Sequence, residues 1–302
     1  MRRGKRWFAL AGILVLATTS RAVAAPACPR GLTADVPARE TGAANGSAFA
    51  SRIMNLTRLA RDRATLAELE RGNLPPFLRE LVAVPIKAYS SDGRPLAGIL
   101  CVMPDYLAVG SDRDFLRMPL GLPAATRIAR RFGFVLPTTR MVDAIHRHTP
   151  RQLRPQPLPT SRRMRSTAYI VQHERAIATQ LRGLGLPAGE LLSGHKKDLV
   201  ASARLDFMRG RVALYGWHEL NGEPIQPLST RHGEHYVDYS HGVRLVSELM
   251  QVNGRVMDVH DVVENTRLAP LVSREGPLPG MARYLPRGQR RASAWQARMD
   301  IR

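Results

Sequence analysis

The sequence predicts an α+β fold in which a helical N-terminal part packs on a mainly antiparallel sheet. Apolar residues with helical spacing dominate the first half of the chain, whereas short alternating segments separated by turn residues dominate the second half. No regular strand–helix–strand alternation occurs, which argues against a parallel α/β sheet. The 302 residues are 44% hydrophobic, so the chain can form a packed core.

The first 25 residues predict a secretory signal peptide. Basic residues between positions 2 and 6 precede an apolar stretch, and small residues at 22–25 are suited to cleavage by a signal peptidase. The apolar stretch is shorter than the roughly 20 residues that span a membrane, although an N-terminal anchor is the alternative. We therefore expect export to the periplasm or the extracellular space, with no transmembrane segment after signal cleavage.

Residues 26–45 are rich in Ala, Pro, Gly and Thr and are predicted to form a flexible tether before a single domain over 46–270. Export would place the only two cysteines, Cys28 and Cys101, in an oxidising compartment where they can pair. The sequence leaves three roles open for Cys101: a buried thiol, half of a disulfide, or a nucleophile.

The first elements expected in the domain are a helix, a hairpin and two further helices. Ser47 is suited to cap a helix that runs to a glycine at position 72. Segments 81–88 and 96–103 predict two strands, because a turn sequence with Gly and Pro joins them. Pro123 suits the first turn of the second helix, and a third should follow Thr138.

The second half begins with a proline-rich crossing at 149–160 and a helix capped by Thr167. Segments 199–207 and 211–217 are predicted as paired strands, and Asn253-Gly254 predicts a tight hairpin. Residues 271–302 are predicted to be a basic, disordered tail, since 274–302 contain seven Arg against two acidic residues. We expect removal of the chain from position 277 to leave the domain folded.

The chain is strongly basic, with 45 Lys and Arg against 25 Asp and Glu and a formal charge of +20. Nearly all of the basic residues are Arg and they are spread along the whole chain, without the motifs of known nucleic-acid-binding modules. We therefore expect no specific nucleic acid as a partner. A basic surface favours an anionic partner, here an anionic cell-envelope polymer or polysaccharide.

Histidine is unevenly distributed, because five of the nine lie between positions 195 and 241. Imidazole and carboxylate are the usual ligands of a catalytic zinc, and the same groups also form metal-free acid/base sites. The sequence predicts that zinc, where it binds, is held by His195, His218, His241 and Asp198.

Candidate catalytic and binding residues lie in the same segments. The predicted catalytic residues are His218, His241, Asp238 and Tyr239, and the predicted substrate-binding residues are Trp217, Arg244 and Lys197. Asp238 and His241 share a face in a helical turn but not on a strand, and the sequence leaves both geometries open. By contrast, His173 lies on the apolar stripe of its predicted helix and is expected in the core.

Several segments together resemble a group of secreted bacterial proteins for which no reaction is established. They are MPL (118–120), LPTTRMVD (136–143), GHKKD (194–198), YGWH (215–218) and YVDYSHGVR (236–244). The resemblance implies that residues 80–265 form one domain. The chain is also similar to zinc D-Ala-D-Ala peptidases, which combine a His/Asp segment with a later Trp-His. It departs from them because His195 and Asp198 are only three residues apart.

Two classes of function follow. The first is a secreted hydrolase that acts on a cell-envelope or extracellular polymer, with peptidoglycan as one candidate, through a His/Asp site; a polysaccharide lyase is a further alternative. The second is a non-catalytic envelope-binding protein. Its aromatic platform would consist of Trp217, Tyr215, Tyr236 and Tyr239.

Overall fold

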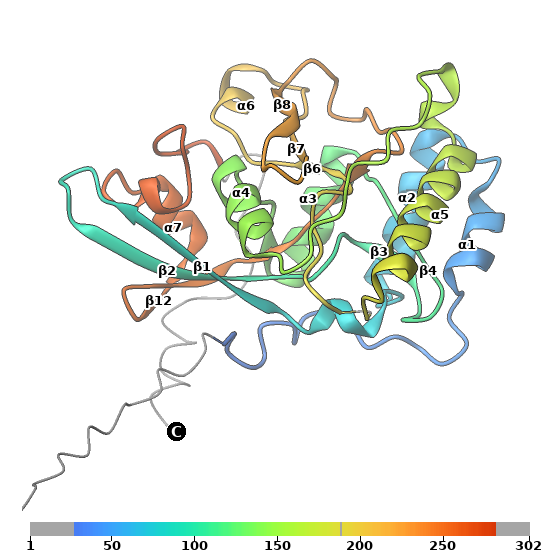
Figure 1. Ribbon diagram of the computed structural model, residues 1–302, viewed down its shortest axis with the longest axis horizontal. Coiled ribbons are helices and arrows are strands. Elements are labelled where there is room, and N and C mark those ends of the chain that lie inside the picture. Colours follow the sequence, from blue (N-terminus) through green and yellow to red (C-terminus); the bar gives the residue numbers. More distant parts are fainter. Residues whose placement is uncertain (1–26, 188, 282–302) are drawn as a thin grey trace, which may run out of the picture.

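The computed structural model describes residues 27–187 and 189–281 (Figure 1). The predicted signal peptide lies outside the described residues. The described part combines helices with mainly antiparallel strands, so the predicted α+β class is confirmed. No helix in these two ranges has the length and apolar character to cross a membrane.

The helices are α1 (Gly46–Ile53), α2 (Arg58–Glu70), α3 (Leu122–Phe132), α4 (Thr139–His148), α5 (Thr167–Leu184), α6 (Arg204–Phe207) and α7 (Val259–Glu264), with 3-10 turns η1 (Pro76–Arg79), η2 (Arg162–Arg165) and η3 (Ala269–Leu271). The strands are β1 (Val82–Tyr89), β2 (Pro95–Val102), β3 (Ala108–Gly110), β4 (Phe115–Arg117), β5 (Phe134–Val135), β6 (Lys197–Leu199), β7 (Leu214–His218), β8 (Pro224–Ser229), β9 (His241–Gly242), β10 (Val246–Ser247), β11 (Leu249–Val252) and β12 (Arg255–Asp258).

The larger sheet has the order β12-β11-β2-β10-β5, and β1 pairs with β2 beside this path. The predicted first hairpin is confirmed, because β1 and β2 pair without interruption from Val82 opposite Val102 to Tyr89 opposite Pro95. The second predicted hairpin joins β11 to β12. Its turn residues Asn253 and Gly254 have φ values of 48° and 81°, which favour Asn-Gly over residues with larger side chains.

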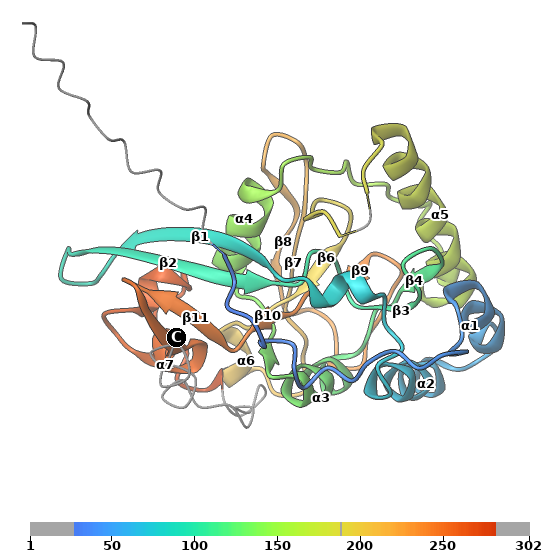
Figure 2. The same ribbon diagram turned by 90° about the horizontal axis from the view of Figure 1, so that it is seen from below.

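The smaller sheet has the order β8-β7-β6-β9 and positions most of the candidate site residues. β6 pairs antiparallel with β7 and parallel with β9. Figures 1 and 2 show β6 and β7 between α4 on one side and α5 on the other. Side chains on the two faces of this sheet therefore meet different helices.

Three predicted elements differ from the structure. The single helix expected from Ser47 is two helices, because the Thr57 hydroxyl accepts a hydrogen bond from the Ala60 amide and begins a new helix. Ser166, rather than Thr167, caps α5 in the same way. The strand expected over 199–207 ends at residue 199, and α6 occupies 204–207, where the tertiary context overrides the alternating pattern.

Residues 27–45 do not form the predicted tether but lie against the domain. Cys28 and Cys101 form a disulfide, with a Cα–Cα distance of 5.7 Å. Leu32 and Val36 are buried. Composition alone missed this packing, because a few apolar side chains and one covalent bond hold a segment that is otherwise rich in turn formers.

The predicted disordered tail includes residues that belong to the folded domain. Leu271, Val272, Leu278 and Met281 are fully buried and belong to the main core. The Leu278 amide donates to the Val263 carbonyl at 2.9 Å, which attaches this segment to α7. The expectation that the chain is dispensable from position 277 is therefore wrong, and the rest of the predicted tail, 282–302, lies outside the described residues.

We predict that Leu278→Ala lowers the free energy of unfolding by about 2–5 kcal/mol, the usual cost of a cavity in a core. The matched control is Leu220→Ala, because Leu220 is 45% exposed. Chemical denaturation measures both. Equal effects of the two substitutions would show that residues 271–281 do not belong to the core.

We predict that the paired substitutions Cys28→Ser and Cys101→Ser lower the free energy of unfolding by about 4 kcal/mol, because the disulfide closes a long loop of the unfolded chain. The two cysteines are 73 positions apart. Thermal melting with and without reductant checks this. A reductant effect that persists in the double variant, or none in the wild type, would contradict it.

Candidate functional site

The polar segment that contains β9 lies in the core rather than at the surface. Residues 237–250 are buried without interruption. His218 is 3% exposed and His241 is 1% exposed. Polar side chains are tolerated there because each finds a hydrogen-bond or ionic partner.

An ion network lies at the centre of these residues. The Arg117 guanidinium binds Asp105, with Nη2 and Oδ2 separated by 2.5 Å, and also binds Glu174 on α5. The His195 Nε2 atom lies 3.1 Å from Asp105 Oδ1. Burial opposes ionisation of Asp105, but the neighbouring Arg117 and His195 hold the pKa of its carboxyl well below the usual range.

Arg244, predicted to bind substrate, is instead a buried internal tether. Its guanidinium donates to the carbonyl of Met103 at 3.0 Å and to that of Leu192 at 2.6 Å. It lies over the Tyr106 ring, 4.3 Å from the centroid, and its Nε atom is 3.9 Å from Asp198 Oδ1. Its charge therefore acts on the interior of the site.

Lys196 adds a second buried cation. Its ammonium donates to the Tyr239 carbonyl at 2.7 Å and lies 3.1 Å from His173 Nδ1. Burial lowers the pKa of Lys196 to about 8. His173 is fully buried, as its position on the apolar stripe of the helix predicted.

Gly216 and Trp217, on β7 of the smaller sheet, have unusual backbone conformations. Gly216 and Trp217 have φ values of 104° and 58°, and Trp217 is one of only two non-glycine residues with positive φ in the described ranges. The Lys197 ammonium lies 5.0 Å from the Trp217 ring centroid. A Cβ atom on Gly216 would point toward Asp198 Oδ2 and His218 Cε1, at 3.5 Å from each.

The face toward α5 carries a cluster that we call the α5-side cluster. Its members are Lys197, Trp217, Tyr236, Asp238 and His241. His241 Nε2 lies 3.5 Å from Asp238 Oδ2, and a turn joins the two residues, so the helical-turn geometry applies. Tyr236 donates to Asp238 at 3.3 Å. Burial lowers the pKa of His241 to about 4.

Tyr239, predicted to be catalytic, anchors the proline-rich crossing. Its hydroxyl accepts a hydrogen bond from the Leu158 amide at 2.7 Å, and its ring lies edge-on to that of Tyr169. The crossing is also attached through the Leu153 amide, which donates to the Ser193 carbonyl at 2.9 Å. The segment at 149–160 therefore lies against the residues that precede β6.

The face toward α4 carries what we call the α4-side cluster. Its members are Asp143, His146, Ser193, Asp198, Tyr215 and His218. His218 Nε2 lies 3.0 Å from Asp143 Oδ1, and Tyr215 donates to the same oxygen at 2.8 Å. Arg274 binds the other oxygen at 2.9 Å from the solvent side. Burial would raise the pKa of Asp143, but these hydrogen bonds and the Arg274 charge lower it.

A second imidazole and a second carboxylate complete this cluster. The His146 ring stacks on that of His218, with centroids 4.5 Å apart, and its Nδ1 atom lies 3.0 Å from Ser193 Oγ. Burial and the neighbouring His218 lower the pKa of His146 to about 4. Tyr106 donates to Asp198 at 2.9 Å, and burial raises the pKa of Asp198 to about 6.

These groups surround a small internal cavity. Its volume of about 10 Å³ is close to that of one water site. The polar side chains that line it are Tyr106, His146, Ser193, Lys196, Asp198, His218 and Arg244. Imidazole and carboxylate groups around one such site can transfer protons to and from a small reactant.

Four residues of the α4-side cluster and its cavity were not predicted as site residues from the sequence: Tyr106, Asp143, His146 and Ser193. A signal for two of them was present, because Asp143 and His146 are three residues apart on a predicted helix and must share a face. Ser193 directly precedes a segment that was singled out. Tyr106 carried no local signal, since its partner Asp198 is 92 positions away.

The four predicted zinc ligands contact different partners. His195, His218 and His241 face Asp105, Asp143 and Asp238 respectively, and Asp198 faces Tyr106. Among residues 27–187 and 189–281, no three His, Cys, Asp or Glu side chains are placed to hold a metal ion together. In this arrangement the four predicted ligands do not fit a zinc site.

The predicted aromatic platform does not form. Trp217 and Tyr239 are buried, and Tyr215 and Tyr236 are only partly exposed. Tyr215 faces Asp143, whereas the other three lie toward α5, so the four rings do not share an exposed surface. Comparison of the chain with known protein families, curated proteins and solved structures found no match.

We predict that the free energy of unfolding falls as the pH falls from about 6.5 to about 4, because buried imidazoles stay neutral in the folded state. His146, His195 and His241 each have a pKa lowered to about 4, so the unfolded chain binds more protons across this window. Denaturant unfolding across this pH range measures the effect.

Asp198 supplies the control for this prediction. Its pKa is raised to about 6, so its contribution runs in the opposite sense and is lost as the pH rises through that value. Asp198→Asn should therefore make the pH dependence steeper than in the wild type. Stability that stays flat or increases toward low pH would contradict the burial of neutral histidines.

Proposed function

We propose that the protein is an exported hydrolase of a cell-envelope polymer and that the α4-side cluster transfers the protons in its reaction. The observation that carries the proposal is the hydrogen bond between His218 Nε2 and Asp143 Oδ1, at 3.0 Å. A carboxylate that orients an imidazole beside a small cavity is a recurring feature of hydrolytic sites.

The protonation states of this pair follow from its neighbours. Asp143 is ionised, since its pKa is lowered by hydrogen bonds and by Arg274, so it accepts hydrogen bonds only. The N–H of His218 that Asp143 accepts therefore lies on Nε2, which leaves Nδ1 as the basic nitrogen. His218 then takes a proton from the attacking water, and Asp143 stabilises the imidazolium that forms.

Asp198 is suited to the opposite role. Burial raises its pKa to about 6, so it can hold a proton near neutral pH and donate it to the leaving group. A Cβ atom on Gly216 would lie 3.5 Å from both Asp198 and His218, so the two groups border the same space. Two carboxylates with pKa values displaced in opposite directions divide the roles of acid and orienting base.

Positive charge borders the same cavity. Arg244 and Lys196 both line it, and neither guanidinium nor ammonium reaches solvent. Charge fixed in a poorly hydrated environment stabilises developing negative charge more strongly than it would in water. Arg244 thus contributes to the proposed reaction from inside the site rather than by binding substrate at the surface.

The proposed location and substrate class draw on other features. The N-terminal sequence has the layout of an export signal, and the Cys28–Cys101 disulfide is compatible with an oxidising compartment. The formal charge of +20 favours an anionic polymer over a neutral one.

Substitutions that test the site must respect burial. His218 and His241 are both enclosed, so alanine at either position costs about 1–3 kcal/mol in lost hydrogen bonds. Alanine variants would therefore confound a loss of activity with a loss of stability. Replacement by glutamine keeps volume and polarity while removing the proton-transfer function.

We predict that His218→Gln lowers the rate of fragment release from purified cell-wall sacculi by about 100-fold or more, the usual contribution of a general base. His241→Gln, in the α5-side cluster, is the matched control and should retain activity. Thermal melts of both variants exclude unfolding. Loss in His241→Gln alone would move the site to the α5-side cluster, and no release by the wild type would contradict the proposed function.

A further inference from the structure

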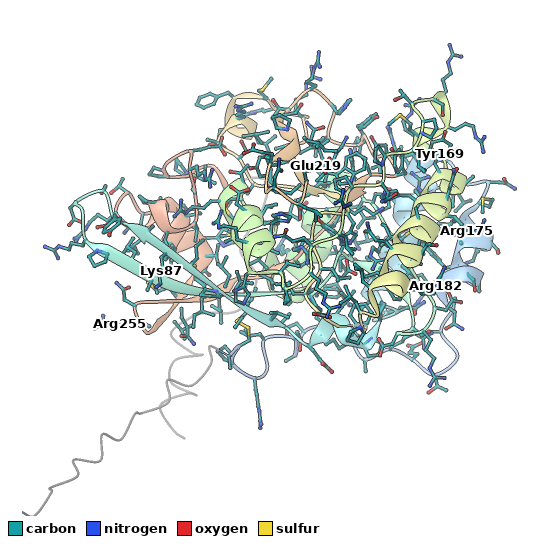
Figure 3. The ribbon with its side chains drawn as sticks, viewed as in Figure 1. Lys87, Tyr169, Arg175, Arg182, Glu219 and Arg255 are labelled. Atoms are coloured by element: carbon teal, nitrogen blue, oxygen red, sulfur yellow. A yellow bond between two sulfur atoms is a disulfide. The ribbon has the colours of Figure 1, made fainter. Side chains whose placement is uncertain are left out.

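A groove follows β1 on the side of the molecule where α4 packs against this strand. It consists of two neighbouring hollows, of about 730 Å³ and about 370 Å³. Lys87 lines both hollows, so they meet at this side chain. Figure 3 shows Lys87 on β1, far from Arg175 on α5.

The charged side chains that line the groove are basic. Its lining includes Lys87, Arg140, Arg147 and His148, and no Asp or Glu of the described residues lines either hollow. Arg140 is fixed in place, because it donates to the Leu271 carbonyl at 3.0 Å and to the Lys87 carbonyl at 2.8 Å. A fixed guanidinium loses little conformational entropy when an anion binds.

An exposed aromatic side chain lies beside these charges. Tyr89 is 71% exposed, and Pro95, Leu96 and Pro270 line the same hollow. Aromatic rings with an apolar face and a polar edge are suited to contact sugar rings. The groove thus offers an apolar contact and several cations along one strand.

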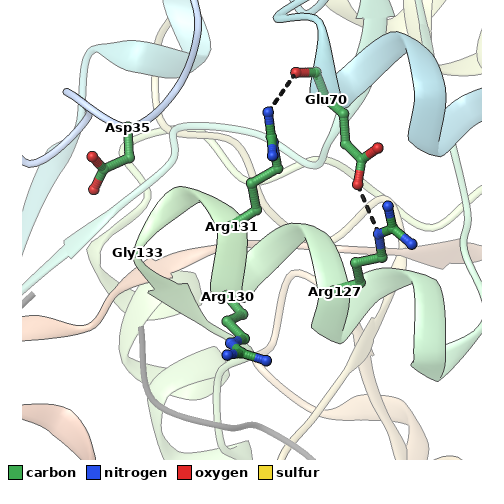
Figure 4. A pocket seen from close by; sticks show the side chains of 6 residues that line it. All are labelled: Asp35, Glu70, Arg127, Arg130, Arg131 and Gly133. Atoms are coloured by element: carbon green, nitrogen blue, oxygen red, sulfur yellow. Dashed lines mark hydrogen bonds and ion pairs between the residues drawn. The ribbon is translucent and has the colours of Figure 1, made fainter. Parts of the chain in front are cut away.

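The hollow beside α3 provides an internal comparison (Figure 4). It also contains arginines, but Asp35 and Glu70 line it as well. Arg127 binds Glu70 at 2.7 Å, and Arg131 donates to the Glu70 carbonyl at 3.5 Å. Its charges are therefore partly neutralised within the protein, unlike those of the β1 groove.

We propose that the β1 groove binds a polysaccharide that carries carboxylate groups. Arg140, Asp143 and Arg147 follow one stripe of α4, so the groove borders the residue that orients His218.

A carboxylated polysaccharide fits the groove better than a nucleic acid. Proteins that bind single strands stack successive bases on several aromatic rings. Among the described residues that line the two hollows, Tyr89 is the only Phe, Tyr or Trp. The assignment of this groove as a substrate site rests on the proposed hydrolase function, so its test measures binding separately from turnover.

Calorimetric titration with oligogalacturonate, a carboxylated polysaccharide, tests the inference. We expect the double substitution Lys87→Ala and Arg147→Ala to weaken binding by about tenfold, as expected for the loss of two ionic contacts. The control is the double substitution Arg130→Ala and Arg175→Ala, which removes the same charge from exposed positions on α3 and α5 and should change binding less than about twofold. Tyr89→Ala should also weaken binding.

The outcomes separate this inference from the proposed reaction. His218→Gln should bind oligogalacturonate as the wild type does, even though it has lost turnover. Absence of binding by the wild type, or equal weakening in both double variants, would overturn the groove while leaving the hydrolase testable on sacculi. Tighter binding of a thymidine oligonucleotide, with the same dependence on Lys87 and Arg147, would assign the groove to nucleic acid and overturn the polysaccharide.

Discussion

The Arg117 guanidinium is buried and positively charged, so the surrounding structure must supply compensating negative charge. Asp105, which follows β2, and Glu174 on α5 supply the compensating charge, so segments far apart in sequence must meet at one point. Without these two carboxylates Arg117 would be an uncompensated buried charge, which costs about 3–5 kcal/mol. Because Asp105 also binds His195, the network holds the segment that leads into β6, and hence the smaller sheet.

The smaller sheet then distributes its polar residues between two faces. A positive φ at Trp217 costs about 1–3 kcal/mol and persists only where the surrounding structure enforces it. Here it places the indole beside Lys197 on the α5 side, while the next residue, His218, meets Asp143 on the α4 side. The strained position therefore lies directly before the proposed base, and it separates that base from the pair formed by Asp238 and His241.

Local features could be predicted from the sequence, whereas the site depended on distant partners. The two hairpins and the helices that begin near Pro123 and Thr138 follow from turn chemistry, capping and periodicity, which a few neighbouring residues determine. Residues 236–242 are largely polar, and polar side chains usually lie at the surface. Their burial depends on contacts between residues that are not neighbours in the sequence. The same is true of the pairing of Asp143 with His218. These two residues are 75 positions apart, so no local sequence pattern predicts their contact.

The tautomer of His218 tests directly whether Asp143 orients this imidazole as a base. Long-range proton–nitrogen NMR of the uniformly labelled protein distinguishes the two neutral forms of an imidazole without a known substrate. We expect a proton on Nε2, bound to the Asp143 carboxylate, and a mixture of forms in Asp143→Asn. A proton on Nδ1 in the wild type would show that Asp143 is not an ionised acceptor and that His218 cannot act as the proposed base.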